Sequence, residues 1–567
     1  MTYRLFLNVS LTLAFLLSAC GGAPTPAAEP TASLAPSPTA TSEPTPLPAT
    51  PVAPVTGLPA GTDGYPWWND TVFYEIFVRS FYDSNGDGIG DLNGITAKLD
   101  YLNDGDPNTT ADLGVSGLWL MPIQPAASYH GYDVTDYYAV NPDYGTLDDF
   151  KRLLAEAHKR GIRVLIDWVP NHTSDQHPWF QAAQDPKSPY RDWYVWSPEA
   201  KGSGWRRSAA GDYYYGFFWE GMPDLNYTNP DVSEQMRDVA RFWLSEVGVD
   251  GFRIDAVKYL IEEGYSEHTD ATHAWLKDFR QFYKGLNPQA LMVGEIWDSS
   301  GLVLDYTSGD ELDLGFDFDL ANALVLGAGA HNANQMDTLL PRDAALFRPG
   351  QFATFLTNHD QNRVMSAFGG DIEKARNAAT LLLTAPGVPF LYYGEEIGLL
   401  GKKPDEDIRL PMQWTGEADG GFTIGRPWRA LNADYAAKNV AAQTDDPDSL
   451  LSHYRALINL RNNHAALRVG DFYLVVTGAS GLFASVRATR DEIILVIVNM
   501  SRDTLTDYKL SLDSGPLAVG EYLAAPLLDG GPFAVLAANA SGGFDAYQPL
   551  PELPVNAQIV IQLQPQK

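Results

Sequence analysis

Cysteine is nearly absent from this chain of 567 residues, in which Cys20 is the only one. A disulfide framework within the chain is therefore excluded. Basic residues are also scarce, with 39 Lys and Arg against 71 Asp and Glu and a formal net charge of −32. Because nucleic-acid binding needs cations that neutralise phosphates, we expect no nucleic-acid partner and favour a neutral ligand.

Apolar runs long enough to cross a membrane are missing at the N-terminus. The stretch at residues 5–17 is too short to span as a mature helix. It leads into Leu-Ser-Ala-Cys at residues 17–20, which resembles the cleavage site of bacterial lipoproteins. The resemblance implies a signal peptide over residues 1–19, cleavage before Cys20 and a lipid on its thiol. We therefore expect an extracytoplasmic protein anchored to a bacterial membrane; a plain secretory signal with an incidental cysteine is the alternative.

Residues 20–62 are dominated by Ala, Pro, Thr and Ser, a composition that cannot build a packed core. We interpret this segment as a semi-extended tether that holds the folded part away from the membrane. The residues from 63 onward are numerous enough for a large domain with accessory domains.

Four apolar, β-branched runs each end in a polar cluster that contains a carboxylate: Asp167, Asp255, Glu295 and Asp360. The intervals are 255−167 = 88, 295−255 = 40 and 360−295 = 65 residues. A βαβ unit takes roughly 30 residues or more, so these intervals fit one unit plus an insertion, one unit and two units. We therefore place the carboxylates after strands 3, 4, 5 and 7 of a (β/α)8 barrel, whose active site lies where the strands end.

Further apolar runs bring the number of expected strands to eight: 71–81, 114–123, 312–320 and 388–397. Uninterrupted apolar runs are typical of buried parallel strands. A helix is predicted from the N-cap Thr146 to the stop at Gly161, with Leu147, Phe150, Leu154 and Ala157 on one face. A doubly wound open sheet is the alternative, but the phosphate-binding glycine motifs that would favour it are absent.

The interval between strands 3 and 4 contains a segment, roughly 171–228, that is rich in Trp and Tyr. We interpret it as a domain inserted into a barrel that spans residues 63–468, because long loops on the catalytic face shape the substrate cleft. From residue 469 to 567, short β-rich runs are broken by Gly, Asp and Asn, which predicts a C-terminal antiparallel β-sandwich.

Paired carboxylates at strand ends suit glycoside hydrolysis, which needs one ionised and one protonated carboxyl group. Asp255 is the candidate nucleophile, because Arg253 lies on the same strand face and a nearby cation favours the ionised form. Glu295 is the candidate general acid, because its apolar neighbours raise a carboxyl pKa. Asp360 would hold sugar hydroxyls, and we expect His172 and His359 to be neutral hydrogen-bond donors rather than metal ligands.

With these motifs in place, the chain resembles glycoside hydrolase family 13, the α-amylase family, from about residue 65 to its end. The resemblance implies a retaining mechanism with Asp255 as nucleophile, Glu295 as acid/base and Asp360 as transition-state stabiliser. It also implies an α-glucan substrate held by several further side chains, namely His130, Tyr132, His172, Arg253, Lys258, His359 and Arg363.

Two further motifs refine the branch of the family. Met-Pro-Asp-Leu-Asn at residues 222–226 resembles the intermediary subfamily of lipoprotein and secreted α-amylases, and the RLPMQW motif at 409–414 fits it. Ala256 is smaller than the valine typical of 1,6-specific relatives, which favours α-1,4 bonds. We expect a monomeric, endo-acting α-amylase. The alternatives are an exo-acting α-glucosidase or oligo-1,6-glucosidase, a trehalose-forming isomerase, and a non-catalytic surface glycan-binding lipoprotein.

One acidic loop has the spacing of a calcium site, with oxygen donors on alternate residues and Gly88 at the sharp turn. A Glu at position 12 is missing, so the loop is not an EF-hand. We predict a structural Ca²⁺ held by Asp83, Asn85, Asp87, the carbonyl of Ile89, and Asp91. A second calcium of the family is doubtful, because Asn171 is present but Tyr259 replaces the usual histidine.

Overall fold

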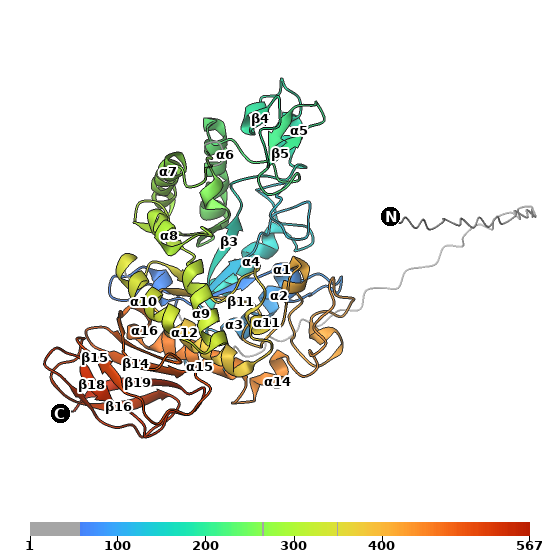
Figure 1. Ribbon diagram of the computed structural model, residues 1–567. Coiled ribbons are helices and arrows are strands. Elements are labelled where there is room, and N and C mark those ends of the chain that lie inside the picture. The colour runs from blue at the N-terminus through green and yellow to red at the C-terminus, as the bar shows by residue number, and fades with distance from the viewer. Residues whose placement is uncertain (1–56, 263–265, 349, 567) are drawn as a thin grey trace, which may run out of the picture. The chain divides into compact units, whose positions relative to one another are not determined.

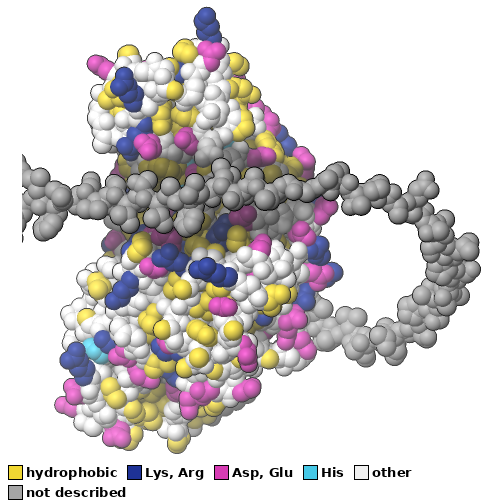
Figure 2. All heavy atoms as spheres, turned by 90° about the vertical axis from the view of Figure 1, so that its right-hand side faces the viewer, with side chains coloured by type: hydrophobic (Ala, Val, Ile, Leu, Met, Phe, Trp, Pro, Cys, Tyr) yellow, Lys and Arg dark blue, Asp and Glu magenta, His cyan; other side chains and the backbone are white. Residues whose placement is uncertain are grey.

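The computed structural model describes residues 57–262, 266–348 and 350–566 (Figure 1). The predicted signal peptide, Cys20 and most of the tether lie outside the described residues. No helix within the described ranges has both the length and the hydrophobicity needed to cross a bilayer. Acidic and basic side chains are interspersed over the face of the molecule shown in Figure 2, which is expected of a solvated surface on an acidic protein.

Eight parallel strands form the predicted barrel, in the order β10-β11-β1-β2-β3-β7-β8-β9. A parallel bridge between Phe316 and Ala353 joins the two ends of this sheet. The strands are β1 (Phe73–Ile76), β2 (Gly117–Leu120), β3 (Arg163–Trp168), β7 (Gly251–Ile254), β8 (Leu291–Gly294), β9 (Leu314–Gly315), β10 (Ala353–Thr354) and β11 (Val388–Tyr392).

Aromatic and aliphatic side chains fill the barrel interior, as in other closed parallel barrels. Phe73 and Phe390 stack with ring centroids 4.5 Å apart, and Phe316 meets Phe390 edge-on at 5.0 Å. Trp119 lies beside Phe316 in the same buried cluster. The interior is therefore a packed core, and polar chemistry is confined to the strand ends.

Helices follow the strands and surround the barrel (Figure 1). The larger ones are α4 (Leu147–Lys159), α6 (Pro230–Arg241), α7 (Asp270–Leu286), α8 (Ser300–Thr307), α9 (Phe318–Ala330), α10 (Asn334–Leu346), α12 (Ile372–Thr384) and α15 (Leu450–Asn463). Short helices lie in the connections: α1 (Val78–Phe81), α2 (Leu92–Ala97), α3 (Leu99–Leu102), α11 (Val364–Ala367), α13 (Asp405–Ile408), α14 (Val440–Thr444) and α16 (Ala465–Val469).

The helix predicted from Thr146 is confirmed as α4. Thr146 accepts a hydrogen bond from the Asp149 backbone N–H, and the Asp149 carboxylate accepts from the Thr146 backbone N–H, which forms a complete capping box. Phe150 and Leu154 are buried on the barrel side. Gly161 has a φ of 78°, a conformation that ends a helix without steric cost only at glycine.

Two strands differ from their predicted positions. The sixth strand, β9, is shorter than predicted and ends at Gly315. The chain turns into α9 at Phe318, because Asp317 caps this helix by accepting a hydrogen bond from the backbone N–H of Leu320. The seventh, β10, ends at Thr354, before Phe355 and Leu356, the apolar residues of the run that we assigned to this strand and that ends in Asp360. The polar residues of that run therefore lie in the loop after the strand.

A small antiparallel sheet, in the order β4-β6-β5, lies between β3 and β7. Its strands are β4 (Trp196–Ser197), β5 (Trp205–Arg207) and β6 (Tyr213–Tyr215), preceded by α5 (Pro178–Ala183). The Phe180 ring stacks on Trp196 at 5.8 Å and meets Tyr214 edge-on at 4.8 Å. Part of the aromatic content of this segment therefore packs its own small core.

The C-terminal part is one eight-stranded antiparallel sheet, in the order β12-β13-β14-β19-β16-β17-β18-β15. Val476 and Ser511 form an antiparallel bridge that joins its two ends, so that the sheet encloses a second hydrophobic core. Its strands are β12 (Asp471–Leu474), β13 (Leu482–Ala488), β14 (Ile493–Asn499), β15 (Leu510–Leu512), β16 (Gly520–Leu528), β17 (Leu536–Ala538), β18 (Phe544–Tyr547) and β19 (Gln558–Pro565).

A buried arginine connects the C-terminal sheet to the barrel. Arg487 on β13 donates to the carbonyls of Thr384 at 2.8 Å and Gly470 at 3.0 Å. Within the barrel, buried Arg461 on α15 donates to the carbonyl of Leu383 in the last turn of α12 and to those of Ala385 and Gly387 in the turn before β11. At the other end of the folded part, Arg163 donates to the carbonyl of Pro59, so the last residues that we assigned to the tether contact the barrel.

Candidate active site

The structure brings four carboxylates together at the carboxyl ends of the strands. Asp167 lies on β3 and pairs in register with Arg253 on β7, while Asp255 and Glu295 directly follow β7 and β8. Asp360 lies in the loop after β10. Because neighbouring parallel strands end at the same edge, residues up to 193 positions apart in sequence share one site.

Arg253 is the centre of this cluster and is almost completely buried. Its Nη1 donates to both oxygens of Asp167, at 2.9 and 3.1 Å, and to Oδ1 of Asp255 at 2.7 Å. Its Nη2 lies 3.1 Å from Oε2 of Glu295, which also accepts from the backbone N–H of Ala256. One guanidinium therefore positions three carboxylates.

A single cation does not neutralise three buried carboxylates, so protons remain bound to the cluster. Burial raises the pKa of Asp167 to about 7, even though Arg253 acts in the opposite direction. Burial also raises the pKa of Glu295, as a general acid requires, and that of Asp255. Arg253 favours the ionised form of Asp255, as we expected, but this cation is shared among three carboxylates and burial outweighs it. An ionised Asp255 requires that the remaining protons reside on Glu295 or Asp167.

Asp360 has the opposite environment. Burial would raise its pKa, but His359 and Arg409 outweigh burial and hold the pKa well below its ordinary value. Nε2 of His359 lies 3.2 Å from Oδ2 of Asp360, and Nη2 of Arg409 donates to Oδ1 at 2.9 Å. Asp360 is therefore a permanent anion in the physiological pH range.

His359 is held by a second carboxylate, Glu75, near the carboxyl end of β1. Nδ1 of His359 lies 2.5 Å from Oε1 of Glu75, and its Nε2 lies 2.6 Å from the Tyr132 hydroxyl. Burial would lower the pKa of His359, but Asp360 and Glu75 outweigh it and raise the pKa to about 10. His359 is therefore a cation, and our expectation of a neutral His359 is wrong.

Tyr132 and His172 line the same site. The Tyr132 hydroxyl donates to Oδ2 of Asp167 at 3.0 Å, and its ring stacks between those of His130 and His359. Burial lowers the pKa of His172 to about 4, so this ring is neutral as expected. Its Nε2 is buried without a hydrogen-bond partner among the described residues, which leaves it available to a sugar hydroxyl.

Two predicted substrate contacts, Lys258 and Arg363, are buried and have partners of their own. The Nζ of Lys258 donates to the carbonyl of Trp297 at 3.2 Å and pairs with Glu267 and Asp298. Arg363 is buried and donates to the carbonyls of Ile408 at 2.8 Å and Tyr393 at 2.6 Å.

The structure does not bring Arg363 to the carboxylates, and Arg409 takes the position next to Asp360. Arg409 and Glu75 are functional residues that our sequence analysis did not assign. Both left a signal in the sequence, since Arg409 begins the RLPMQW motif and Glu75 is a lone carboxylate inside an apolar run.

Exposed aromatic rings flank the carboxylates, although aromatic side chains are usually buried. Phe218, which is 43% exposed, contacts the ring of His172, and its neighbour Phe217 packs on Tyr259. Trp297 is 46% exposed and stacks on Phe318 with ring centroids 4.6 Å apart. Such rings offer flat apolar surfaces for the C–H faces of sugars.

The loop predicted to bind calcium is a series of tight turns after α1. Asp83 accepts hydrogen bonds from Gly86 and Gly88, Asp87 accepts from Ile89, and Asp91 caps α2. Gly88 has a φ of 93° at the sharp turn.

The donors of this loop are hard oxygens; Oδ1 of Asn85 and Oδ1 of Asp87 each accept a single hydrogen bond, whereas both oxygens of Asp83 accept two. The donor set therefore fits Ca²⁺ in its chemistry. Among the described residues, the one group of three acidic or histidine side chains close enough to share an ion lies elsewhere, at Glu267, His268 and Asp298. A calcium in the loop would thus also need the oxygens of Asn85 and Ile89.

Comparisons with known proteins agree with this geometry. A model of the alpha amylase catalytic domain matches residues 75–470. Alpha-amylase 3 of Dictyoglomus thermophilum is 41% identical over 451 residues, covering 77% of this chain and 86% of that protein. The oligo-1,6-glucosidase of Parageobacillus thermoglucosidasius is 33% identical, covering 77% and 91%.

The trehalose synthase/amylase TreS of Mycolicibacterium smegmatis is 36% identical over 520 residues, covering 78% of this chain and 85% of that protein. Among solved structures, the α-amylase from H. orenii superposes with a TM-score of 0.76 at 40% identity. That match covers 87% of this chain and 99% of the solved one.

Replacing Glu75 by Gln should lower the pKa of His359, because it removes one of the two carboxylates that raise it. We expect kcat to fall at least about tenfold, the equivalent of one pKa unit or about 1.4 kcal/mol, with little change in KM. Because folding raises the pKa of His359, protonation of this residue stabilises the folded state. The stabilisation is fully present below pH 6.5, the ordinary pKa, and is lost as the pH rises through about 10. The loss of Tm in Glu75→Gln should therefore be largest below pH 6.5 and should shrink towards pH 10.

Glu396→Gln is the matched control, because Glu396 is equally buried and accepts from the hydroxyls of Tyr74 and Tyr101 rather than from His359. Its kcat should stay close to that of the parent. A pH-independent loss of Tm in Glu75→Gln with unchanged kcat would show that Glu75 has a merely structural role.

Proposed function

The chain belongs to the α-amylase family of glycoside hydrolases, and on this premise we propose that it is a retaining, endo-acting α-amylase that cleaves α-1,4-glucosidic bonds of starch and maltodextrins. The observation that carries the proposal is the pair Asp255 and Glu295 on one buried guanidinium beside an ionised Asp360. The three side chains are 11%, 14% and 29% exposed, so a substrate can reach them.

In the proposed first step, the carboxylate of Asp255 attacks the anomeric carbon while Glu295 donates its proton to the glycosidic oxygen, which leaves with the released chain. In the second step, Glu295 takes a proton from water, the water oxygen attacks the anomeric carbon, and Asp255 is freed. A retaining mechanism needs carboxyl groups about 5–5.5 Å apart. Contact of both groups with Arg253 supports such a close spacing.

Asp360 is suited to stabilise the positive charge that develops on the sugar ring, because His359 and Arg409 keep it ionised. Nε2 of His172, which has no partner among the described residues, can donate to a sugar hydroxyl, and the Tyr132 hydroxyl links Asp167 to His359 beside the reaction centre. These groups are fixed by their own hydrogen bonds before a substrate binds, so little reorganisation is needed.

Several features support the finer assignment. The exposed rings of Phe218 and Trp297 lie on loops after different strands, which suits a chain of several sugars rather than a disaccharide. Ala256 is small, and the motif at 222–226 resembles that of the intermediary subfamily. The relatives also include an oligo-1,6-glucosidase and a trehalose synthase/amylase, so these activities are the competing assignments within the family.

The test of this proposal is the early product profile from soluble starch, with maltose and isomaltose assayed in parallel. We expect mixed maltodextrins and a fast loss of iodine colour, with slow attack on both disaccharides. Glu295→Gln and Asp255→Asn should each lose about 10⁴-fold or more in kcat while they keep the Tm of the parent.

Other outcomes would reassign the enzyme. Glucose as sole product, or rapid cleavage of isomaltose, would make it a glucosidase, and trehalose formed from maltose would make it an isomerase. Turnover retained in either folded variant would refute the catalytic assignment.

We also propose that the loop of residues 83–91 binds a structural Ca²⁺. A cation there would fix the connection after β1. Chelation should lower the Tm and added Ca²⁺ should restore it; at 100 times the Kd, the expected stabilisation is about 2.7 kcal/mol.

The Asp87→Asn variant distinguishes a loss of metal binding from a loss of the turn. An amide oxygen can still accept from the Ile89 N–H, as Asn85 does from Asp87. The variant should therefore keep the Tm of the chelated parent and lose most of the response to Ca²⁺. Asp106→Asn, in a similar turn, is the control. An equal Ca²⁺ response in all three proteins would refute the site.

We further propose that the protein acts as a monomer outside the cytoplasm, attached to the membrane by a lipid on Cys20. Each buried CH₂ of an acyl chain contributes about 0.8 kcal/mol to membrane binding. The parent should sediment with membranes and release a lipid-modified N-terminal peptide in mass spectrometry, whereas Cys20→Ala should not. A parent found only in the soluble fraction, without acylation, would contradict the anchor.

A further inference from the structure

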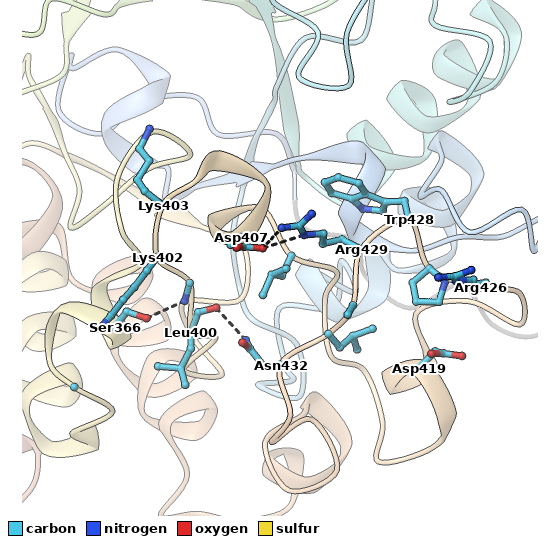
Figure 3. A pocket seen from close by; sticks show the side chains of 16 residues that line it. Ser366, Leu400, Lys402, Lys403, Asp407, Asp419, Arg426, Trp428, Arg429 and Asn432 are labelled. Carbon is cyan, nitrogen blue, oxygen red and sulfur yellow. Dashed lines mark hydrogen bonds and ion pairs between the residues drawn. The ribbon is translucent and has the colours of Figure 1, made fainter. Parts of the chain in front are cut away.

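A large cavity of about 1340 Å³, in the loops after the last two barrel strands, contains cations that are already balanced (Figure 3). Arg429 donates to the carboxylate of Asp407 at 2.9 Å, and Lys403 pairs with Asp405. The two other cations of the lining are exposed to water. Because each of these cations has a carboxylate or water beside it, a bound anion would add little there.

A smaller cavity, of about 290 Å³, lies between the barrel and the C-terminal sheet. Its lining comes from α10, from the turns before β10 and β11, from the segment 468–473 and from Arg487 on β13. Residues that precede the strands lie on the face of a barrel opposite to the catalytic one, where side chains serve stability. The cavity is therefore separate from the carboxylates of the active site.

Arg487 brings a buried charge to this cavity that no carboxylate neutralises. The residue is 1% exposed, and its two Nη atoms donate to the carbonyls of Thr384 and Gly470. Its Nε is buried and has no hydrogen-bond partner among the described residues. Burial lowers the pKa of Arg487 to about 9, although the charge of Asp471 acts in the opposite direction.

A second buried guanidinium adds to this charge. Arg461 donates to three backbone carbonyls, and one of them belongs to Gly387, which lines the cavity. Its Nε also has no partner within the described ranges. Burial lowers the pKa of Arg461, and the nearby charges of Arg487 and Arg468 lower it further. Two buried cations therefore repel each other across a junction in which their hydrogen-bond acceptors are carbonyls.

The carboxylates near the cavity do not balance these two cations. Arg468 lines the cavity, but its Nε donates to Asp70 at 2.9 Å, so this carboxylate is already paired. Asp471 is the one carboxylate of the lining, and it is exposed to water. A buried charge without a counter-charge is costly, and an anion in the cavity would remove part of that cost.

We propose that this cavity binds a small inorganic anion, such as chloride or phosphate, beside Nε of Arg487, and that the anion stabilises the junction between the barrel and the C-terminal sheet. Guanidinium N–H groups donate strong, charge-assisted hydrogen bonds to anions. The volume is close to the lower limit of about 300 Å³ for drug-sized ligands, so it suits a compact ion with its waters. This inference does not depend on the substrate of the active site.

Two measurements on the unmodified protein test the proposal directly. Anomalous diffraction from crystals that contain sodium bromide should show a bromide ion in the cavity, next to Nε of Arg487. Calorimetry with inorganic phosphate at low ionic strength should show saturable binding, which bromide displaces. Binding of bromide alone would identify a halide site, and tighter binding of phosphate an oxyanion site. Bromide found only on the outer surface, together with no saturable heat from phosphate, would overturn the proposal.

Ala345→Glu connects the binding to this cavity. Ala345 is an exposed residue of the lining on α10, so the variant adds a carboxylate to the cavity without removing a contact. We expect the Kd of the anion to rise at least about tenfold, because like charges repel at a partly buried site. Ala345→Gln has the same size without the charge and should stay within about threefold of the parent.

Leu346→Glu is the matched control for charge. It adds the same carboxylate to the next residue of α10, which is 49% exposed and does not line the cavity. Because water and salt screen an exposed charge, its Kd should stay within about twofold of the parent. An unchanged Kd in Ala345→Glu, or an equal rise in both variants, would show that the anion does not occupy the cavity.

The stabilising role has its own readout. A ligand that binds the folded state raises the Tm until the site is saturated. The Tm of the parent and of Leu346→Glu should therefore rise with bromide or phosphate and then level off, whereas Ala345→Glu should lose this response. An equal rise in all three proteins would assign the effect to general salt stabilisation and would overturn the site.

Discussion

The shared guanidinium of Arg253 is the interaction on which the rest of the site depends. It contacts carboxylates from three neighbouring strand ends, and the register of β3 with β7 places Asp167 directly beside it. Since a buried charge without a partner is costly, each carboxylate of this cluster is tied to the cation and to the others. The barrel fixes the backbone at the strand ends, and Arg253 holds the side chains of Asp255 and Glu295 at a fixed distance from each other because it contacts both.

The two halves of the site differ in how they hold protons. Around Arg253, burial raises carboxyl pKa values, so this half keeps protons available for transfer. Around Asp360, two cations surround one carboxylate, and this half stays charged. Glu75 maintains the difference, because it helps to keep His359 protonated. The reaction proposed here needs both halves, a proton donor on one side of the sugar and a permanent anion on the other.

Sequence patterns predicted the barrel, the C-terminal sheet and the strand ends that carry the carboxylates, because all of these depend on local runs and regular spacing. They failed where a long-range contact decides the outcome. Glu75 meets His359 across 284 residues, so neither the role of Glu75 nor the charge of His359 could be found locally. Arg363 is close to Asp360 in sequence, yet it bonds to carbonyls of the loop after β11, and Arg409 from that same loop reaches Asp360 instead.

The buried arginine between the C-terminal sheet and the barrel bears on how this architecture can evolve. Arg487 belongs to the sheet, yet it satisfies a carbonyl at the end of α12, a helix of the barrel. A gene that ended at residue 468 would leave that carbonyl without its donor and would uncover the apolar surface around it. The C-terminal sheet is therefore not an exchangeable module, and recombination that replaces it must also supply a donor for this turn. Duplication and shuffling should preserve the two parts as one inherited unit.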